Sequence, residues 1–598
     1  MTWGSRGAAL AVGMLTVCAL VSGCAATGRG VRRQATPRDP GPFPTRAALA
    51  SLEQPPPAEK LPELDIPLVE QWELAGPFPE RIGLVPAEYR GGFGAQLVSY
   101  ARERGPKLAV SADMACFARE SGRFILARGS MPPSGLQRHM AGRCGSPGVR
   151  HDVLSLTGEV PPGVTEEQLA AHMKDRFAEL LKKVPSGPGQ TAAGVWFGRS
   201  GKKAVVAVAT EHLDVDLDPI SFAPGPDGAV VLSGTLARPA NRLEALITRG
   251  RLDFAVCRAD PEVKLPRFSL RCPANRADAS AWVDLFVFAP EQVLGSLGVD
   301  LLVFPQGKGT TTYARPVLRP GSGAPEEDAA RFAYLLNGLR AELGLKPVVV
   351  SAGESRLAQK IAPNYFASVY GKAPQHVADM VALGMMAGWE VDQVTRAAYF
   401  SDWVSTGDVS VLLAEMLDSP GARRTLFEPS VRSLAFGSYR MASHDVLAAM
   451  VATYAPFEEQ PPLAEAQQVI AALNKARAQR GLGPADMVPL PEDVRAEMDE
   501  GLAAGVAMDD IINPVLQRVS QITRRGVRGG VLETGSLEAI RFPEELLTRP
   551  NLAVFVAVTH YKPRGSPWGV YVVGLAFSME SVQTAALEAP VTSSSLAL

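Results

Sequence analysis

The sequence predicts a multidomain α+β protein, in which layered units of helices and strands accompany one all-β sandwich. Three observations predict it. A chain of 598 residues holds about four domains, at ~150 residues each. A helix-and-stop pattern near residue 336 recurs near residue 473, whereas residues 212–310 form short runs rich in Val, Leu and Phe. A hydrophobic content of 46% with 20% charged residues suits packed domains and excludes a chain disordered throughout.

Net charge and residue counts argue against two classes of partner, nucleic acids and metal clusters. Lys and Arg total 60 against 62 Asp and Glu, which gives a formal net charge of −2. A nucleic-acid binder should carry a basic excess or stripe, so we expect no nucleic-acid partner. Seven His and six Cys in so long a chain also leave little material for metal clusters.

The N-terminus predicts export. Arg6 gives a short basic region, and residues 8–21 form an apolar stretch too short to span a bilayer comfortably. Residues 20–24 read Leu-Val-Ser-Gly-Cys, which resembles a bacterial lipobox. The resemblance implies that residues 1–23 are a lipoprotein signal peptide and that Cys24 is acylated, palmitate being a typical chain. An ordinary signal peptide followed by a chance Cys is the alternative.

Acylation of Cys24 would place the protein at a membrane. At ~0.8 kcal/mol per buried methylene, several acyl chains anchor a protein almost permanently. Ala25 and Ala26 follow the Cys without an Asp retention signal, so the sequence resembles an outer-membrane lipoprotein. We expect an exported protein, anchored at the periplasmic face of the outer membrane or at the cell surface.

The remaining cysteines suggest disulfides. Cys18 leaves with the signal peptide and Cys24 is acylated, so four cysteines remain, an even number that suits disulfides in an oxidising compartment. Three pairings are possible, and we favour the pairing of sequence neighbours; four buried free thiols are the alternative. The favoured pairs are Cys116 with Cys144 and Cys257 with Cys272.

Two segments are expected to lie outside the domains. Residues 24–75 contain many prolines, and nine of them fall between residues 27 and 70, so this segment is predicted to be an extended tether. Residues 581–598 are predicted to be a C-terminal tail.

Residues 211–315 are predicted to form the β-sandwich. Short apolar runs occupy residues 229–236, 252–257, 281–288 and 301–304, and Pro and Gly clusters separate them. Short strands at such intervals are typical of a small antiparallel sandwich.

Residues 325–455 and 463–580 are predicted to be related units. Residues 336–347 and 473–484 agree at seven of twelve positions, at an offset of 137. In the first copy, residues 332, 335, 336 and 339 form one apolar helical stripe, and Gly344 with Pro347 ends the helix. Residues 100–105 echo this pattern weakly, so residues 76–210 are predicted to be a third, degenerate unit.

One motif carries a family resemblance. Residues 419–429 read Ser-Pro-Gly-Ala-Arg-Arg-Thr-Leu-Phe-Glu-Pro, and Leu434 to Gly437 continue the pattern. This segment resembles bacterial CAP domains, of the cysteine-rich secretory and pathogenesis-related (CAP/SCP) superfamily. The resemblance implies αβα sandwiches; it is most specific over 325–445 and weakest over 90–210.

The same resemblance predicts no metal site. Family members often build a cation cleft from two His and two acidic residues. Here Ala422 stands at the motif His, Asp402 is a displaced acid, and residues 362–364 contain no His. A cation needs converging nitrogens or carboxylates. We therefore expect no metal, no cofactor and no catalytic residue of the family type.

Other candidates for chemistry are weaker. Asp509 and Asp510 form an acidic pair that is better explained as a turn or a helix cap. His560, at the end of a predicted strand, has no neighbouring residues in the sequence that would complete a catalytic or metal-binding cluster. His139 with Cys144 and Cys116 could imitate a thiol nucleophile with its base, unless the cysteines pair. Residues 198–203 lack the spacing of a phosphate loop and suit a hairpin turn.

These observations support a non-enzymatic lipoprotein whose degenerate CAP-like domains bind a protein, a glycan or a lipid. Two alternatives stay open. One is a cell-envelope hydrolase or peptidase with a non-standard site, and the other is a lipid or sterol carrier.

Overall fold

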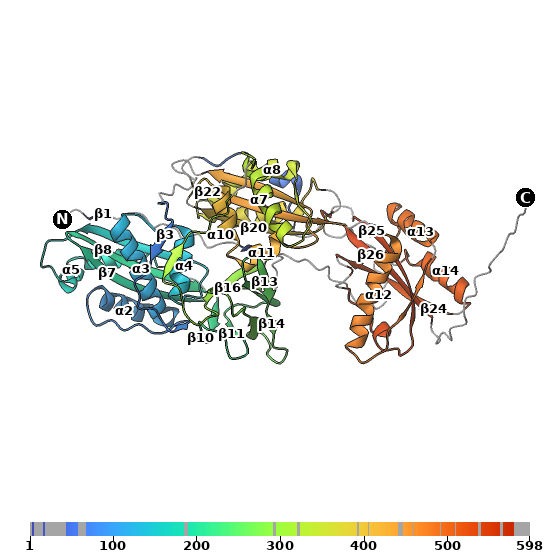
Figure 1. The fold of residues 1–598 in the computed structure, drawn as a ribbon, viewed down its shortest axis with the longest axis horizontal. Helices are drawn as coiled ribbons and strands as arrows, with labels where there is room; N and C mark the ends of the chain where they lie inside the picture. Colours follow the sequence, from blue (N-terminus) through green and yellow to red (C-terminus); the bar gives the residue numbers. More distant parts are fainter. Residues whose placement is uncertain are drawn as a thin grey trace, which may run out of the picture. The chain divides into compact units, whose positions relative to one another are not determined.

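A computed structural model describes the protein over most of its length (Figure 1). It describes residues 3–4, 16–17, 43–57, 67–184, 189–290, 295–319, 323–391, 394–404, 406–440, 446–457, 460–490, 492–508, 510–524, 526–535, 537, 540–562 and 566–578. Of these, residues 43–391 and 397–455 belong to one compact unit, unit 1. Residues 394–396 and 456–578 belong to the other, unit 2.

The same sheet topology occurs three times in the chain. Copy one has strands β5, β6, β7 and β8; copy two has β19 to β22; and copy three has β23 to β26. In each copy the spatial order is first, third, fourth, second, and the first strand runs parallel to the third. The bounds are Leu108–Val110, His151–Glu159, Gln190–Ser200 and Lys203–Leu213 for copy one, Val349–Val350, Val394–Val404, Ser433–Arg440 and Leu447–Pro456 for copy two, and Asp486–Pro489, Val527–Thr534, Ala553–Tyr561 and Val570–Ser578 for copy three. Two short strands, β1 (Trp3–Gly4) and β2 (Thr16–Val17), pair with the outer edges of β6 and β20.

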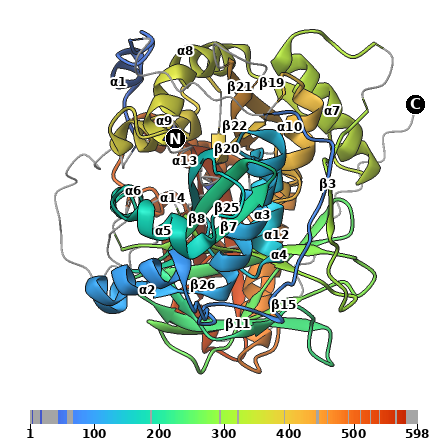
Figure 2. The same ribbon diagram turned by 90° about the vertical axis from the view of Figure 1, so that its left-hand side faces the viewer.

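Helices cover both faces of each sheet. Copy one carries α2 (Gly92–Arg104), α3 (Ala112–Arg128), α4 (Ser134–Arg143), α5 (Glu166–His172) and α6 (Lys174–Leu181). Copy two carries α7 (Asp328–Glu342), α8 (Ala352–Val369), α9 (Gln375–Ala387), α10 (Val409–Met416) and α11 (Pro420–Leu426). Copy three carries α12 (Pro462–Ala478), α13 (Glu492–Ala503) and α14 (Asn513–Thr523). Figure 2 shows α3 running along β7 and β8.

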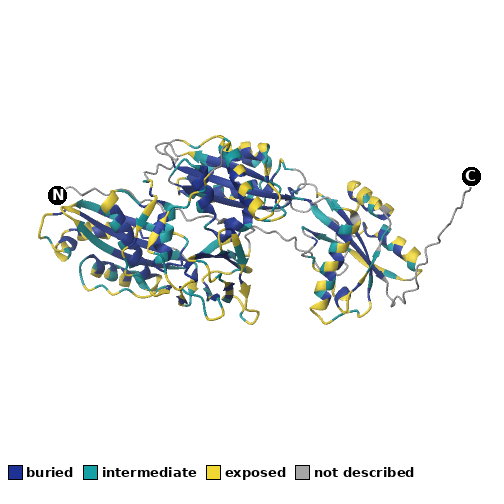
Figure 3. Cartoon of the chain, viewed as in Figure 1, coloured by how far each residue is buried: buried dark blue, intermediate teal, exposed yellow. Residues whose placement is uncertain are grey.

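Alternating side chains of the strands build a separate core on each face of a sheet. In copy one, Leu154 and Val206 pack with the side chains of α2, α5 and α6, whereas Val153 and Val205 pack with those of α3 and α4. This alternation is the period-2 pattern of strands covered on both sides. Buried residues accordingly concentrate in the sheets and on the inward faces of the helices (Figure 3).

The all-β part consists of two four-stranded antiparallel sheets. One has the order β14-β15-β11-β9 and the other β13-β12-β16-β17. Their bounds are Val215–Leu217 (β9), Ala229–Leu236 (β11), Arg242–Arg249 (β12), Asp253–Val256 (β13), Arg258–Ala259 (β14), Arg267–Pro273 (β15), Ala281–Phe288 (β16) and Ser296–Val303 (β17). Side chains from both sheets share one core. The multidomain α+β class, with αβα layers and a β-sandwich, is therefore confirmed.

Both favoured disulfides are present. Cys116 on α3 is bonded to Cys144 at the end of α4, with an S–S distance of 2.01 Å. Cys257, just after β13, is bonded to Cys272 on β15, with an S–S distance of 2.06 Å, and so joins the two sheets of the sandwich. The bond at Cys116 also removes the thiol that a Cys–His nucleophile would need.

Part of the expected tether is folded instead. Helix α1 (Arg46–Ala50) buries Leu49 completely, and the indole nitrogen of Trp389 donates to the carbonyl of Pro44 at 3.1 Å. Further along, β3 (Gln71–Glu73) pairs with β18 (Thr312–Ala314). The prediction overlooked that residues 45–52 are free of proline and that Thr45 caps a helix there, accepting from the N–H of Ala48.

The repeated sequence pattern has a structural role in copies two and three. Asn337 exchanges two hydrogen bonds with the backbone of Val348, and Asn474 does the same with Ala485. The buried guanidinium of Arg340 donates to the carbonyls of Lys346, Leu426 and Val431 at 2.8, 2.6 and 3.2 Å. Arg477 repeats this with carbonyl oxygens of Gly483, Leu546 and Pro550 at 2.8, 2.6 and 3.0 Å.

Copy one keeps the topology without these contacts. When Gly105, at φ 70°, is aligned with Gly344, at φ 68°, Val98 and Ala101 stand where copy two has Asn337 and Arg340. The weak sequence echo in copy one reflects this loss of the polar anchors, and not a different fold.

Candidate functional site: a cavity at the junction of unit 1

Unit 1 contains a cavity of about 330 Å³ where three of its parts meet. Copy one contributes α4, the sandwich contributes β16 and β17, and copy two contributes the end of β20 and the end of α10. The segment around β18 completes the wall. This volume lies within the range of small-molecule sites, and we call it the junction cavity.

Arg138 on α4 holds copy one to the sandwich. Its guanidinium makes a bidentate pair with Asp300 of β17, at 2.7 and 2.8 Å, and lies 3.8 Å from a carboxylate oxygen of Asp284. It also stacks on the ring of Trp282, 3.8 Å from the centroid. The bond between Cys144 and Cys116 fixes the end of α4 on α3, so this helix is held at both sides.

Copy two supplies three more carboxyl groups to the cavity wall. Asp402 comes from β20, Glu415 from the last turn of α10, and Asp418 from the following loop. Asp402 accepts from the N–H of Trp403 at 2.8 Å. The carboxyls of Glu415 and Asp418 accept no hydrogen bond from any residue that the structure describes.

Burial raises the pKa of all three carboxyls. It raises the pKa of Asp402 to about 7, although the hydrogen bond from the N–H of Trp403 and the positive charge of Arg138 both oppose this rise. Burial, reinforced by Asp402 and Asp418, raises the pKa of Glu415 well above its ordinary value. The pKa of Asp418 is also raised by burial, although Arg138 and Arg423 oppose the shift.

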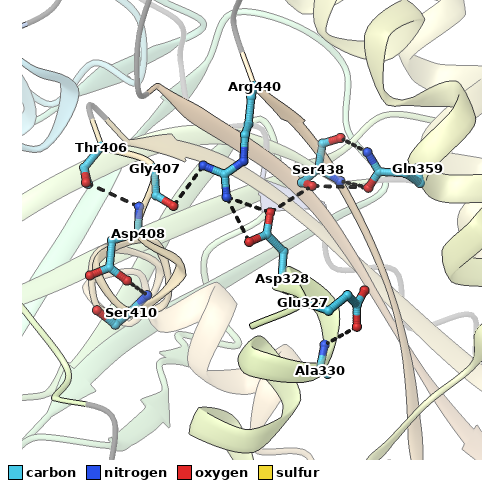
Figure 4. A network of polar contacts seen from close by, with 10 residues as sticks. All are labelled: Glu327, Asp328, Ala330, Gln359, Thr406, Gly407, Asp408, Ser410, Ser438 and Arg440. Carbon is cyan, nitrogen blue, oxygen red and sulfur yellow. Dashed lines mark hydrogen bonds and ion pairs between the residues drawn. The ribbon is translucent and has the colours of Figure 1, made fainter. Parts of the chain in front are cut away.

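Polar contacts within copy two fix α10, and with it Glu415. Arg440 of β21 donates to both carboxylate oxygens of Asp328 at 2.9 Å and to the carbonyl of Gly407 at 3.1 Å (Figure 4). Asp408 caps α10 by accepting from the N–H of Ser410 at 2.8 Å. These contacts tie the start of α10 to the first turn of α7.

The motif that resembles the CAP family forms a joint with the sandwich. The buried carboxylate of Asp284 on β16 accepts from the hydroxyl of Ser419 at 2.7 Å and from the N–H of Gly421 at 3.2 Å. Arg423 donates to the carbonyl oxygens of Gly250 and Asp253 at 3.0 and 2.7 Å. A polar network at such a joint fixes the arrangement only when its members are satisfied, as most are here.

Two histidines of copy one also line the cavity. Burial lowers the pKa of both His139 and His151 to about 4, so both are neutral at pH 7. The Nε2 atom of His151 lies 2.6 Å from the hydroxyl of Ser146, which donates to the buried Glu211. Ser146 is 1% exposed and lies behind the cavity wall, where it is not placed as a nucleophile.

The other residues singled out from the sequence are scattered. Cys24 and Asp509 lie outside the described residues. Ala422 is completely buried, and Asn364 donates to the carbonyls of Leu52 and Gln54 at 2.8 and 2.7 Å. In unit 2, the ring of His560 contacts Glu465 at 2.7 Å and stacks on that of Phe457. Among the described residues, no group of three or more His, Cys, Asp or Glu is arranged to hold a metal ion.

Sequence reasoning singled out two residues that line the cavity, Asp402 and His139, and missed the rest. A usable signal was present in the sandwich, where Asp284 and Asp300 interrupt strands that are otherwise apolar. A carboxylate inside such a strand needs a partner, because an unpaired buried charge is costly. Arg138, Glu415 and Asp418 gave no comparable signal.

Raising the pH from 6.5 to 8 is expected to lower the free energy of unfolding of unit 1. Burial, with the charge of Asp300, raises the pKa of Asp284 to about 7, as burial does for Asp402. A carboxyl whose pKa is higher in the folded than in the unfolded protein stabilises the fold while it is protonated. This contribution to the free energy of unfolding is lost as the pH rises from the pKa in the unfolded chain through the pKa in the folded protein. His139 and His151 act oppositely, but only between about pH 4 and 6.5, given their lowered pKa of about 4.

Urea unfolding at several pH values, followed by hydrogen exchange in unit 1, tests this dependence. Asp284→Asn should flatten the slope above pH 6.5, whereas Asp379→Asn, at an exposed position on α9, should leave it unchanged. A slope that is the same in all three proteins would contradict the assignment to Asp284.

Comparisons with known proteins add the following. No family model and no curated protein matches the chain. Among solved structures, Na-ASP-1 is similar at 10% identity over 44% of this chain and 92% of its own, with a TM-score of 0.23. A cysteine-rich secretory protein from Staphylococcus aureus has 10% identity, 51% and 82% coverage and a TM-score of 0.17. An extracellular protein containing an SCP domain from Bacillus anthracis is similar at 12% identity over 41% of this chain and 86% of its own, with a TM-score of 0.16.

Two of these structures carry the name of the superfamily that the motif at Ser419 resembles. Likenesses at such TM-scores carry no argument about ligand or activity. Within the described part of the chain, no helix has both the length and the apolar character needed to cross a membrane.

Proposed function

We propose that this protein is an exported binding protein, anchored to a membrane through acylated Cys24, whose ligand occupies the junction cavity. The observation that carries the proposal is the cavity itself: about 330 Å³, with three carboxyl groups on one wall and two aromatic side chains, Trp282 and Trp403, beside them. Two of these carboxyls, Glu415 and Asp418, accept no hydrogen bond from a described residue, and such groups in a concave site are available to a ligand. The lipobox supports export and anchoring to a membrane, and the two disulfides suit an oxidising compartment.

A cell-envelope hydrolase is the second candidate, because one observation favours it. Asp402, with a pKa of about 7, stays largely protonated below neutral pH, and Asp300 in the same cavity is paired with the guanidinium of Arg138. A protonated and an ionised carboxyl in one cavity are the groups that glycoside hydrolysis uses. A lipid or sterol carrier has less support, because charged groups line the cavity.

A variant that fills the cavity tests the binding proposal. Thr312 lies on β18 in the cavity wall and is exposed, so Thr312→Trp should block the cavity without removing a core side chain. Thr311 is also exposed but does not line the cavity, so Thr311→Trp is the matched control. Full-length protein would be titrated calorimetrically with muropeptides, short peptides and phospholipid vesicles, and the mixtures analysed by mass spectrometry for products.

We expect one of these classes to bind without forming products, and the binding to be lost in Thr312→Trp and kept in Thr311→Trp. Binding that is equal in both variants would contradict the cavity as the site. Turnover that Asp402→Asn abolishes would establish the hydrolase instead.

The anchor makes a separate prediction. Cys24→Ser should abolish labelling of the protein by radioactive palmitate and move it from the membrane to the soluble fraction, because no thiol then remains for acylation at the lipobox. A variant that stays in the membrane with unchanged labelling would show that Cys24 is not the anchor.

A further inference from the structure

We propose that the ligand of the junction cavity is an organic cation, with an ammonium or guanidinium group held between the carboxyls of copy two. This inference rests on the proposed function, since it names the ligand class of the same site. It would make the protein a receptor for amines or for basic side chains of a larger molecule.

Charge is the first argument. The carboxyls of Asp300, Asp402, Glu415 and Asp418 line the cavity, whereas Arg138 is the one Arg or Lys among the described lining residues. Arg138 is already bound by Asp300. The guanidinium of Arg315, beside the cavity, influences Glu415 through its charge but forms no ion pair with it within the described structure. The wall formed by copy two therefore has more acidic than basic side chains.

The second argument is independent of the carboxyls. Tyr313 of β18 is 6% exposed and lines the cavity, yet its hydroxyl makes no hydrogen bond with any described residue. Because the side chain is buried while its hydroxyl stays open to the cavity, a ligand atom in the cavity is the partner available to that hydroxyl. The ring of His139 lies 5.7 Å from that of Tyr313, and the indole of Trp403 completes an aromatic border of the type that attracts organic cations.

The spread of the carboxyls favours an organic cation over a bare metal ion. A divalent cation requires several oxygens at about 2 to 2.6 Å from one point. No group of three or more such side chains is arranged in this way in the part of the chain that the structure describes. Carboxyls distributed over one wall instead suit a cation whose N–H groups point in several directions.

Binding of a cation should depend on pH in a defined direction. The groups that face Asp402 and Glu415 are Asp418 from the same copy, Arg138 and His139 from α4, Asp300 from β17, and Tyr313 with Arg315 from the segment around β18. Burial raises the pKa of Asp402 to about 7 and that of Glu415 above its ordinary value, so both hold protons in acid. A cation selects the ionised carboxyls and expels these protons, so affinity should rise as the pH rises through about 7.

Calorimetric titration of the full-length protein with agmatine, which has one guanidinium and one ammonium group, tests the inference. We expect agmatine to bind at pH 6.5 with release of protons, measured in two buffers of different ionisation enthalpy, and to bind at least ten-fold more weakly at pH 5.5 than at pH 8. Glutarate, glucose and calcium chloride serve as anionic, neutral and metal-ion probes.

Two substitutions locate the binding. Glu415→Gln and Asp418→Asn should each weaken agmatine binding at least ten-fold without lowering the unfolding temperature, because burial already favours the uncharged form of both side chains. Asp379→Asn makes the same charge change at an exposed position outside the cavity and should bind agmatine like the unaltered protein.

The outcomes separate this inference from the proposed function. If glucose, glutarate or calcium binds, is blocked by Thr312→Trp, and agmatine does not bind, then the cavity is a site but its ligand is not an organic cation. Agmatine binding that survives Thr312→Trp, Glu415→Gln and Asp418→Asn overturns the assignment to this cavity. Failure of every probe, muropeptides and peptides included, overturns both proposals.

Discussion

Replacing Arg340 with Met is expected to lower the free energy of unfolding of unit 1 by about 3–5 kcal/mol, comparable to breaking a buried charge network. The guanidinium of Arg340 is buried and donates to four carbonyl oxygens, those of Lys346 after α7, Leu426 at the end of α11, and Glu428 and Val431 after α11. Met fills much of the same volume but leaves those carbonyls without donors, each at a cost of about 1–3 kcal/mol. Burial lowers the pKa of Arg340 only to about 10, so the side chain stays charged at neutral pH and its hydrogen bonds are charge-assisted.

Arg477→Met is the matched variant in unit 2, because Arg477 makes the equivalent contacts in copy three. Hydrogen exchange followed by mass spectrometry reports the stability of each unit separately within the full chain. Each substitution should destabilise its own unit and leave exchange in the other unchanged. Arg340→Lys should recover only part of the loss, since an ammonium lacks the planar fork that reaches several carbonyls.

Equal effects of either substitution on both units would contradict this account, as would a loss below about 1 kcal/mol, the scale of a single ordinary hydrogen bond.

Replacing Arg138 with Met is expected to cost unit 1 a similar amount, about 3–5 kcal/mol, for a different reason. The loss leaves Asp300 without its bidentate partner and takes a positive charge away from the buried Asp284. An uncompensated charge is what makes removing one member of a buried pair so destabilising. Exchange should increase first in α4, β16 and β17, which meet at this pair.

A double substitution provides the control. Adding Asp300→Asn to Arg138→Met removes the unpaired charge and should restore part of the stability, giving a favourable interaction energy in a double-mutant cycle. If the double variant were as unstable as the sum of the two single variants, the pair would be uncoupled and Arg138 would act only by filling space beside Trp282.

The sequence determined the layered part of the fold well, because its signals are local. The apolar stripe at residues 332–339 and the stop at Gly344 and Pro347 correspond to the buried face and the end of α7. The spacing of Pro and Gly between short apolar runs likewise marked the strands of the sandwich. In both cases the pattern that identifies the element lies within a short stretch of sequence, so no knowledge of distant contacts is needed.

The junction cavity was beyond this reasoning because its parts are far apart in the chain. Arg138 and Asp300 are 162 residues apart, and Ser419 and Asp284 are 135 apart. Neither Arg138 nor Glu415 lies in a pattern that marks it as functional. The motif at Ser419 was visible, but its hydrogen bonds to Asp284 depend on the sandwich lying against it.

The position of the sandwich between copies one and two in the chain sets an order of assembly. A fragment ending at residue 319 would contain α4, β16, β17 and β18, and so the Arg138–Asp300 pair, but none of the carboxyls contributed by Asp402, Glu415 and Asp418. During synthesis the cavity cannot be completed until residue 418 has joined the growing fold. Copy two therefore completes a cavity that copy one and the sandwich begin, and all three parts contribute to its wall.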